Sequence, residues 1–81
     1  MGTTLSYRDR AILRAVAGGG AELVAGVEPD LFLDGLCCAD QTAAHRLARA
    51  GLIATAVPGA PGSRVPARLT EVGADALALA G

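Results

Sequence analysis

The sequence contains no lysine, no asparagine and no tryptophan, and only one histidine and two cysteines. Aromatic residues make up 2% of it, so the core has to come from leucine, isoleucine and valine, with Phe32. No stretch approaches the ~18 uncharged apolar residues that a membrane helix needs. The N-terminal residues show no basic segment followed by an apolar one, as a signal peptide would. We therefore expect a cytoplasmic protein that makes no contact with a membrane.

Few side chains are suited to metal binding or catalysis. Cys37 and Cys38 are adjacent, so on a helix they point about 100° apart and neither share a metal nor readily bridge each other. With His45 as the only histidine, no zinc site can be assembled. No set of nucleophile, base and acid is present either. We expect no metal, no cofactor and no enzymatic activity.

The length of 81 residues is enough for one domain, spanning residues 1–81. A domain of this size buries a modest core and is marginally stable alone. Dimerisation would supplement that core. The apolar segment ALALA at residues 76–80 is a candidate contact for a homodimer.

Charge is unevenly distributed, although the net charge is only −1. Residues 20–40 contain five carboxylates and no base, whereas residues 41–70 contain four arginines and a histidine and no acid. The acidic group is Glu22, Glu28, Asp30, Asp34 and Asp40; the basic group is His45, Arg46, Arg49, Arg64 and Arg68. A local field of this kind attracts a polyanion more than net charge suggests. The alternative is a solvated surface with a chance distribution of charge.

A first helix is predicted over residues 7–17. Ser6 is a suitable N-cap, and Asp9 three residues later completes a capping box. Apolar side chains then recur at helical spacing, and the glycine run at residues 18–20 ends the helix. Residues 21–25, bounded by glycines, fit a loop or a short strand, and we favour a strand with a single bridge.

Two further helices are predicted close together. Pro29 suits the first turn of a helix over residues 29–37, in which Phe32, Leu33, Leu36 and Cys37 form an apolar stripe. Asp40 then caps a helix over residues 41–50, and Gly51 ends it. Because only about three residues separate the two, we expect a helix-turn-helix.

A hairpin and a last helix complete the chain. Residues 52–69 read as two strands joined by the glycine- and proline-rich segment 59–63. Pro66 indicates an edge strand or the start of one, because proline donates no hydrogen bond to a neighbouring strand. Thr70 caps a C-terminal helix over residues 71–80.

The segments RLARAGLI and RLTEVGADAL resemble the winged helix-turn-helix superfamily, in particular small bacterial or phage regulators of the MarR and PadR type. The matching residues are Leu47, Gly51 and Leu52 at the end of the recognition helix, and Leu69, Thr70 and Gly73 at the entry to the last helix. The resemblance implies a mainly α fold with a small β-hairpin: a three-helix core, a two- to three-stranded wing and a C-terminal helix. The long flanking helices that form dimers in those regulators are missing here.

The outward side of the helix over residues 41–50 is the candidate site. Helical geometry places five polar side chains on it, none of them acidic: Gln41, Thr42, His45, Arg46 and Arg49. Such a row suits base edges and phosphates in a major groove. We expect the first four near bases and Arg49 at a phosphate. A solvated face is the alternative; His45 could lack any role, and Arg46 could turn to Asp34 or Asp40.

The hairpin supplies the remaining candidates. By the resemblance, Arg64 contacts the minor groove or the backbone, with Ser63 beside it, and Arg68 braces the hairpin against a phosphate or an acid. The sequence thus predicts a sequence-specific regulator that binds double-stranded DNA, with a homodimer as a candidate assembly. The alternative is a winged-helix module that binds another protein through the same face or through the acidic helix over residues 29–37.

Overall fold

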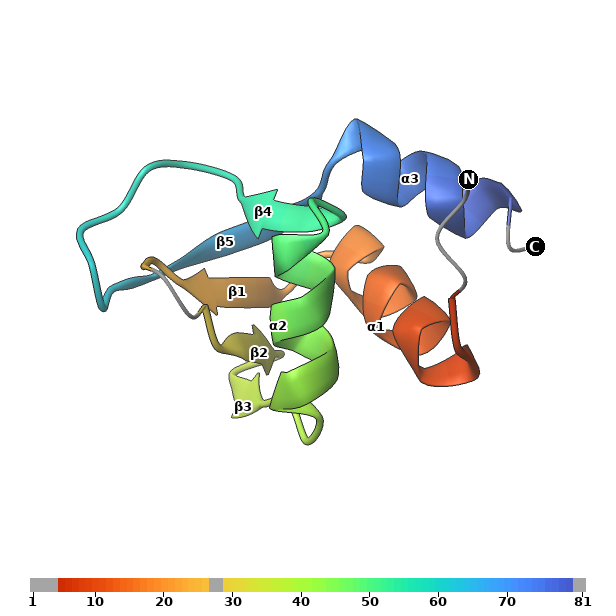
Figure 1. The fold of residues 1–81 in the computed structure, drawn as a ribbon. Coiled ribbons are helices and arrows are strands. Elements are labelled where there is room, and N and C mark those ends of the chain that lie inside the picture. The colour runs from red at the N-terminus through yellow and green to blue at the C-terminus, as the bar shows by residue number, and fades with distance from the viewer. Residues whose placement is uncertain (1–4, 27–28, 80–81) are drawn as a thin grey trace.

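A computed structural model describes residues 5–26 and 29–79. These residues form three helices and five strands in the order α-β-β-β-α-β-β-α (Figure 1). The elements are α1 (Tyr7–Ala17), β1 (Ala21–Val24), β2 (Leu31–Leu33), β3 (Leu36–Cys37), α2 (Gln41–Arg49), β4 (Ile53–Thr55), β5 (Arg64–Leu69) and α3 (Glu71–Leu79). Glu28 and Ala80, which the sequence placed in the acidic segment and in the last helix, lie outside the described residues.

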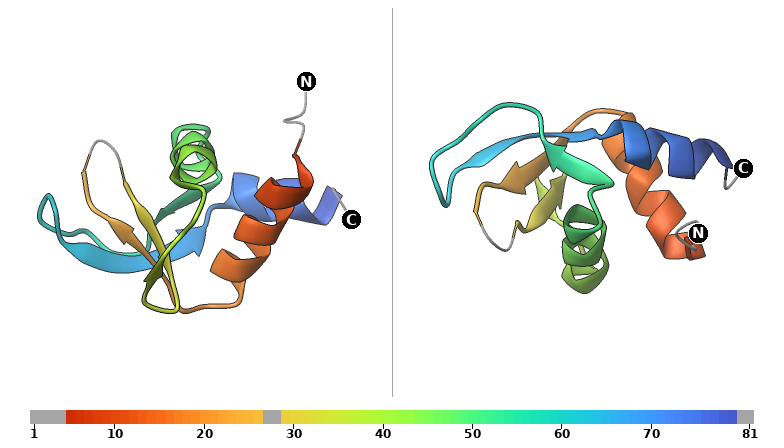
Figure 2. Two further views of the ribbon diagram at one scale, coloured as in Figure 1. Left: turned by 90° about the horizontal axis from the view of Figure 1, so that it is seen from below. Right: turned by 45° about the horizontal axis from the view of Figure 1, so that its top comes forward.

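The strands form one antiparallel sheet in the order β3-β2-β1-β5-β4. α2 lies across one face of the sheet and projects from it, whereas α1 and α3 lie together at one end (Figures 1 and 2). The core fills the space between the helices and the sheet. Its fully buried side chains include Leu13 of α1, Leu23 and Leu31 of the sheet, Leu47 of α2 and Leu52. Burial of these groups is the main source of stability.

The first helix is confirmed as the sequence predicts it. α1 spans Tyr7–Ala17, and both bonds of the capping box form. The Asp9 amide donates to the Ser6 hydroxyl, and the Ser6 amide donates to the Asp9 carboxylate, each over 3.0 Å. The short strand after the glycines is also present, as β1, but the single bridge is wrong: β1 pairs over three residues with β2 and over three with β5.

The prediction of a helix over residues 29–37 is wrong. That segment is the hairpin of β2 and β3, in which Phe32 pairs with Cys37 and Leu33 pairs with Leu36. Asp34 and Gly35 form its two-residue turn, with φ of 52° and 82°. Positive φ at both central residues is the geometry for which Asp-Gly is favoured in hairpins. The apolar residues on either side of this turn produce the same spacing that we read as a helical stripe.

The prediction of a mainly α winged-helix fold is therefore wrong as well. Among the described residues, three strands separate α1 from α2, so no helix precedes α2 across a short turn. Because the segment is a hairpin, it cannot serve as an acidic helix that crosses DNA or binds a partner. The protein is instead a small α+β domain with a five-stranded sheet.

The hairpin over residues 52–69 is present, but its second strand lies inside the sheet. β5 pairs with β4 on one side and with β1 on the other, so Pro66 does not mark an edge. The Pro66 carbonyl accepts from the Ala56 amide over 2.7 Å, and proline has no N–H for the reciprocal bond. β4 ends at the preceding residue, Thr55. Proline is accommodated here because the β4–β5 pairing stops beside it.

α3 is confirmed as a C-terminal helix that begins after Thr70, whose hydroxyl accepts from the Gly73 amide over 3.0 Å. Gly73 is the buried residue of this helix and packs on the backbone of Leu52. A Cβ atom at Gly73 would collide with the Leu52 carbonyl oxygen. The close contact between α3 and the start of β4 therefore requires glycine.

Candidate nucleic-acid interface

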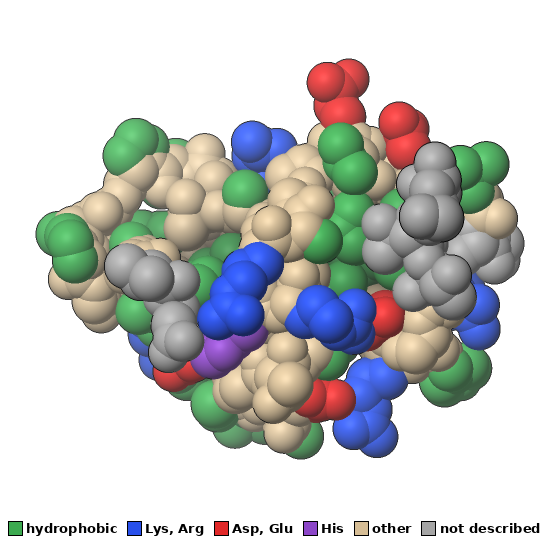
Figure 3. Space-filling view, viewed as in Figure 1, with side chains coloured by type: hydrophobic (Ala, Val, Ile, Leu, Met, Phe, Trp, Pro, Cys, Tyr) green, Lys and Arg blue, Asp and Glu red, His purple; other side chains and the backbone are tan. Residues whose placement is uncertain are grey.

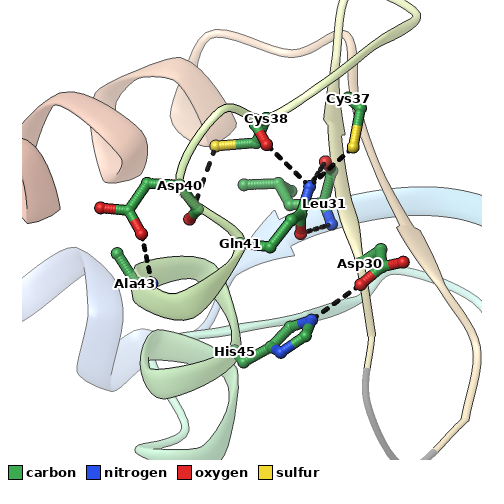
Figure 4. A network of polar contacts seen from close by, with 8 residues as sticks. All are labelled: Asp30, Leu31, Cys37, Cys38, Asp40, Gln41, Ala43 and His45. Carbon is green, nitrogen blue, oxygen red and sulfur yellow. Dashed lines mark hydrogen bonds and ion pairs between the residues drawn. The ribbon is translucent and has the colours of Figure 1, made fainter.

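α2 is held in place at its N-terminus and along one side. The Asp40 carboxylate accepts from the Ala43 amide over 2.9 Å and caps the helix (Figure 4). This bond, with one from Arg8, lowers the pKa of Asp40 below its ordinary value. Ala43, Ala44 and Leu47 are buried against the core. The other side of α2 is therefore fixed toward solvent.

Gln41 is turned toward the sheet, although the sequence placed it in the outward row. Its amide oxygen accepts from the Leu31 amide, and its amide nitrogen donates to the Leu31 carbonyl, both over 2.8 Å (Figure 4). The same nitrogen lies 3.0 Å from the Cys38 carbonyl and 3.0 Å from the Cys37 sulfur. Gln41 thus pairs with β2 much as a neighbouring strand would, and its polar atoms are occupied within the protein.

His45 faces outward and contacts a carboxylate from a different element. Its Nε2 atom lies 2.8 Å from Oδ1 of Asp30, the residue that precedes β2 (Figure 4). The histidine side chain is 23% exposed and that of Asp30 is 51% exposed. Asp30, which belongs to the acidic segment, therefore holds the imidazole ring on the surface beside α2.

Arg46 is paired with Asp9 of α1, a partner that the sequence did not suggest. Its guanidinium donates to the Asp9 carboxylate, which is 2% exposed, whereas the Arg46 side chain is 52% exposed. Burial alone would raise the pKa of Asp9, but the bonds from Arg46 and the Ser6 amide and the charge of Arg46 lower it below its ordinary value. One buried carboxylate thus caps α1 and also links it to α2.

Thr42 and Arg49 are exposed on α2. Together with His45 and Arg46 they line an open hollow of about 340 Å³. We call these four residues the α2 face. In Figure 3, which looks onto α2, arginine and histidine side chains alternate with acidic ones across this part of the surface. The helix itself carries no carboxylate, but Asp9 and Asp30 from neighbouring elements match two of its basic groups.

The hairpin residues do not extend the α2 face. Val65 is buried on the core side of β5, so strand alternation directs Arg64 and Arg68 to the sheet face away from α2. Arg64 donates to Glu22 of β1 over 2.8 Å and stacks 3.9 Å above the Phe32 ring. Arg68 donates to the Leu69 carbonyl over 3.3 Å. The single cationic ridge of helix and hairpin that the sequence suggested does not form.

Ser63 lies in the loop before β5, where its hydroxyl donates to the Ala60 carbonyl over 2.6 Å. Arg8 is a residue that sequence reasoning missed: from α1 it donates to Asp40 over 3.2 Å and adds a charge beside the N-terminus of α2. Arg8 directly precedes Asp9 on α1, and both side chains lie on the side of the helix that meets α2. This position next to Asp9 is the signal in the sequence that could have identified Arg8.

Within residues 5–26 and 29–79, no group of three or more histidine, cysteine or acidic side chains is arranged to hold a metal. The helices of this part of the chain are too short or too polar to cross a membrane.

No protein-family model matches this chain, and the comparisons with curated proteins and with solved structures found no match. Any functional assignment therefore depends on the residues and their geometry.

Proposed function

We propose that this chain binds double-stranded DNA through the α2 face, without a contribution from the hairpin arginines. The observation that supports this most is the shape and chemistry of α2. It projects from the sheet, contains no acid, and directs Thr42, His45, Arg46 and Arg49 to one side. A nine-residue helix is about 14 Å long, and a major groove about 12 Å wide admits such a helix.

The carboxylates beside the α2 face reduce its field but leave its donors usable. Arg46 keeps half of its side chain exposed, although its partner Asp9 is buried. A guanidinium has five N–H donors, so one directed at Asp9 can also reach a phosphate. Arg49 lies one turn from His45 and is exposed. We assign Arg46 and Arg49 to phosphates, and Thr42 and His45 to base edges.

A second candidate function, binding of another protein, is favoured by a different part of the surface. A groove of about 470 Å³ runs between α1 and the β2–β3 hairpin. It is lined mainly by apolar side chains such as Ile12, Leu33 and Leu36, and Leu36 is 74% exposed. Exposed apolar surface of this kind is typical of protein contacts.

Salt dependence separates the two functions. If Arg46 and Arg49 contact phosphates, DNA affinity should fall about 10-fold between 50 and 200 mM salt. Fluorescence anisotropy with a labelled duplex measures this directly. An affinity for DNA that is absent at 50 mM salt, or independent of salt, would contradict the proposal. Retained affinity for a protein partner at high salt would support the second candidate.

Matched arginine variants locate the contact. Arg49→Ala should weaken DNA binding and reduce the salt slope by about one. Arg68→Ala is the control: it removes an equally exposed arginine from the sheet face away from α2, and should leave affinity unchanged. Equal losses for both variants would show that the hairpin contributes. A role in transcription further requires sequence preference, which selection from random duplexes tests; Thr42→Ala should relax that preference.

A further inference from the structure

The end of the molecule formed by α1 and α3 exposes apolar side chains, beside charged groups that form no ion pair within residues 5–26 and 29–79. On α3, Gly73 faces the core, which leaves Val72 58% exposed and Leu79 89% exposed. On α1, Tyr7 is 78% exposed. Large apolar groups that remain in water at one end of a small domain indicate a surface that another molecule covers.

Each of the two helices presents one sign of charge beside its apolar groups. α3 carries Glu71 and Asp75 on the same side as Val72 and Leu79. Figure 3 shows acidic side chains at the top, over α3. α1 carries Arg10 and Arg14 on the side of Tyr7, and the Arg10 guanidinium lies 5.9 Å from the centre of the Tyr7 ring. We call these seven residues the end surface.

The charged side chains of the end surface form no ion pair with other described residues. Among residues 5–26 and 29–79, the ion pairs join Arg8 to Asp40, His45 to Asp30, Arg46 to Asp9 and Arg64 to Glu22. Within that part of the chain, none of the four charged groups of the end surface forms an ion pair, although α1 and α3 contact each other. Their charges therefore point away from each other and toward solvent.

The spacing of these charges matches between the helices. Arg10 and Arg14 are four residues apart, as are Glu71 and Asp75, so each pair is separated by about 6 Å along its helix axis. Contact of α1 with a second α1 would oppose arginines, and contact of α3 with a second α3 would oppose carboxylates. Like charges in such contacts cost affinity. The complementary contact is α1 against α3 of another copy.

We propose that this chain forms a two-fold symmetric homodimer in which α1 of each protomer packs against α3 of the other. A two-fold axis makes both contacts at once, because residue sets that complement each other on one chain meet twice in an isologous interface. Tyr7, Val72 and Leu79 supply the apolar centre, and the four charged residues set the pairing. The proposal is independent of DNA binding, because α2 is outside the interface.

Charge reversal with reconstitution tests this interface. Sedimentation velocity between about 1 and 200 µM should show the natural chain converting from monomer to dimer with concentration. The double variants Glu71→Arg/Asp75→Arg and Arg10→Glu/Arg14→Glu should each dimerise about tenfold or more weakly. Their equimolar mixture should restore a dimer of nearly natural affinity, because one contact is then reversed in sign and the other is unchanged.

Circular dichroism checks that each variant is folded. If a double variant unfolds, the neutral changes Asp75→Asn and Arg14→Gln provide milder probes of the same contact. A natural chain that stays monomeric at the highest concentration would overturn the proposal. So would a mixture of folded variants that fails to form the mixed dimer, because a contact through other residues would not depend on this complementarity.

Discussion

The α2 face and the end surface use charge in opposite ways. On the α2 face, Arg46 and His45 are each held by a carboxylate from another element, Asp9 and Asp30. On the end surface, Arg10 and Arg14 of α1 and the two acids of α3 form no ion pair among the described residues. The difference teaches that charges close in sequence need not serve one purpose: some fix the fold, and others remain available to a second molecule.

Among the variants that compare the two regions, Gly73→Ala should have the largest effect on stability. The added methyl group would meet the Leu52 carbonyl oxygen, so α3 must move away from the sheet. We expect a loss of about 3 kcal/mol in the free energy of unfolding, measured by urea denaturation, together with weaker dimerisation. Ala74→Gly is the control for helix propensity, with an expected loss of about 1 kcal/mol. Equal stability of Gly73→Ala and the natural chain would contradict the packing of α3.

The next largest difference should appear when one acid is removed from each region, Asp9 beside the α2 face and Asp75 on the end surface. Asp9→Ala takes away the capping-box bond from the Ser6 amide and the partner of Arg46, and hydrogen bonds to charged groups contribute about 1.5–3 kcal/mol. We expect Asp9→Ala to lose about 2–3 kcal/mol of unfolding free energy and Asp75→Ala to change it by less than about 0.5 kcal/mol. Chemical denaturation at dilute concentration, where the chain is monomeric, gives both values. A loss for Asp75→Ala as large as that for Asp9→Ala would contradict the comparison.

Within α2, replacement of Gln41 should cost more stability than replacement of Thr42, by a smaller margin than for the two acids. Gln41→Ala leaves the Leu31 amide without its acceptor, whereas the Leu31 carbonyl keeps the bond from the Cys38 amide; we expect a cost of about 1–2 kcal/mol. Thr42→Ala removes an exposed group and should change stability by less than about 0.5 kcal/mol. DNA affinity should show the reverse order, with Thr42→Ala weaker than Gln41→Ala once both are folded. Greater loss of DNA affinity for Gln41→Ala would return that residue to the binding face.

The smallest expected effect is the pH dependence of the Asp9 contribution. The pKa of Asp9 is lowered in the folded state, so its stabilising effect is fully present above its unfolded pKa of about 3.9 and is lost as the pH falls through the folded value. The stability difference between the natural chain and Asp9→Asn should therefore be constant near pH 7 and shrink below about pH 4. A difference that stays constant down to pH 2.5 would show that the carboxylate charge does not matter.

Local signals in the sequence predicted some elements correctly. The capping box at Ser6 and Asp9, the cap at Asp40 and the stop at Gly51 depend on neighbouring residues alone, and α1, α2 and α3 begin as expected. The hairpin of β2 and β3 was missed because its apolar residues fit a helical stripe as well as two short strands. The pair Asp34 and Gly35 held the deciding signal, since positive φ at both residues suits a two-residue hairpin turn.

The candidate site was predictable only in part, for a physical reason. Periodicity separates the buried side of α2 from its exposed side, and it placed Thr42, His45, Arg46 and Arg49 correctly on the outside. It cannot show what approaches from elsewhere in the chain. Asp9 lies 37 residues from Arg46, and Leu31 lies ten residues from Gln41, so both contacts depend on tertiary structure.

Amide chemical shifts measured by NMR test most directly whether the α2 face binds DNA and the end surface binds a second copy of the chain. Added DNA duplex, at a protein concentration low enough to keep the chain monomeric, should shift amides of residues 41–50 and leave those of residues 7–17 and 71–79 in place. A rise in protein concentration without DNA should shift the α1 and α3 amides and not those of α2. DNA-induced shifts confined to α1, α3 or β5, or no shifts with either addition, would contradict the account.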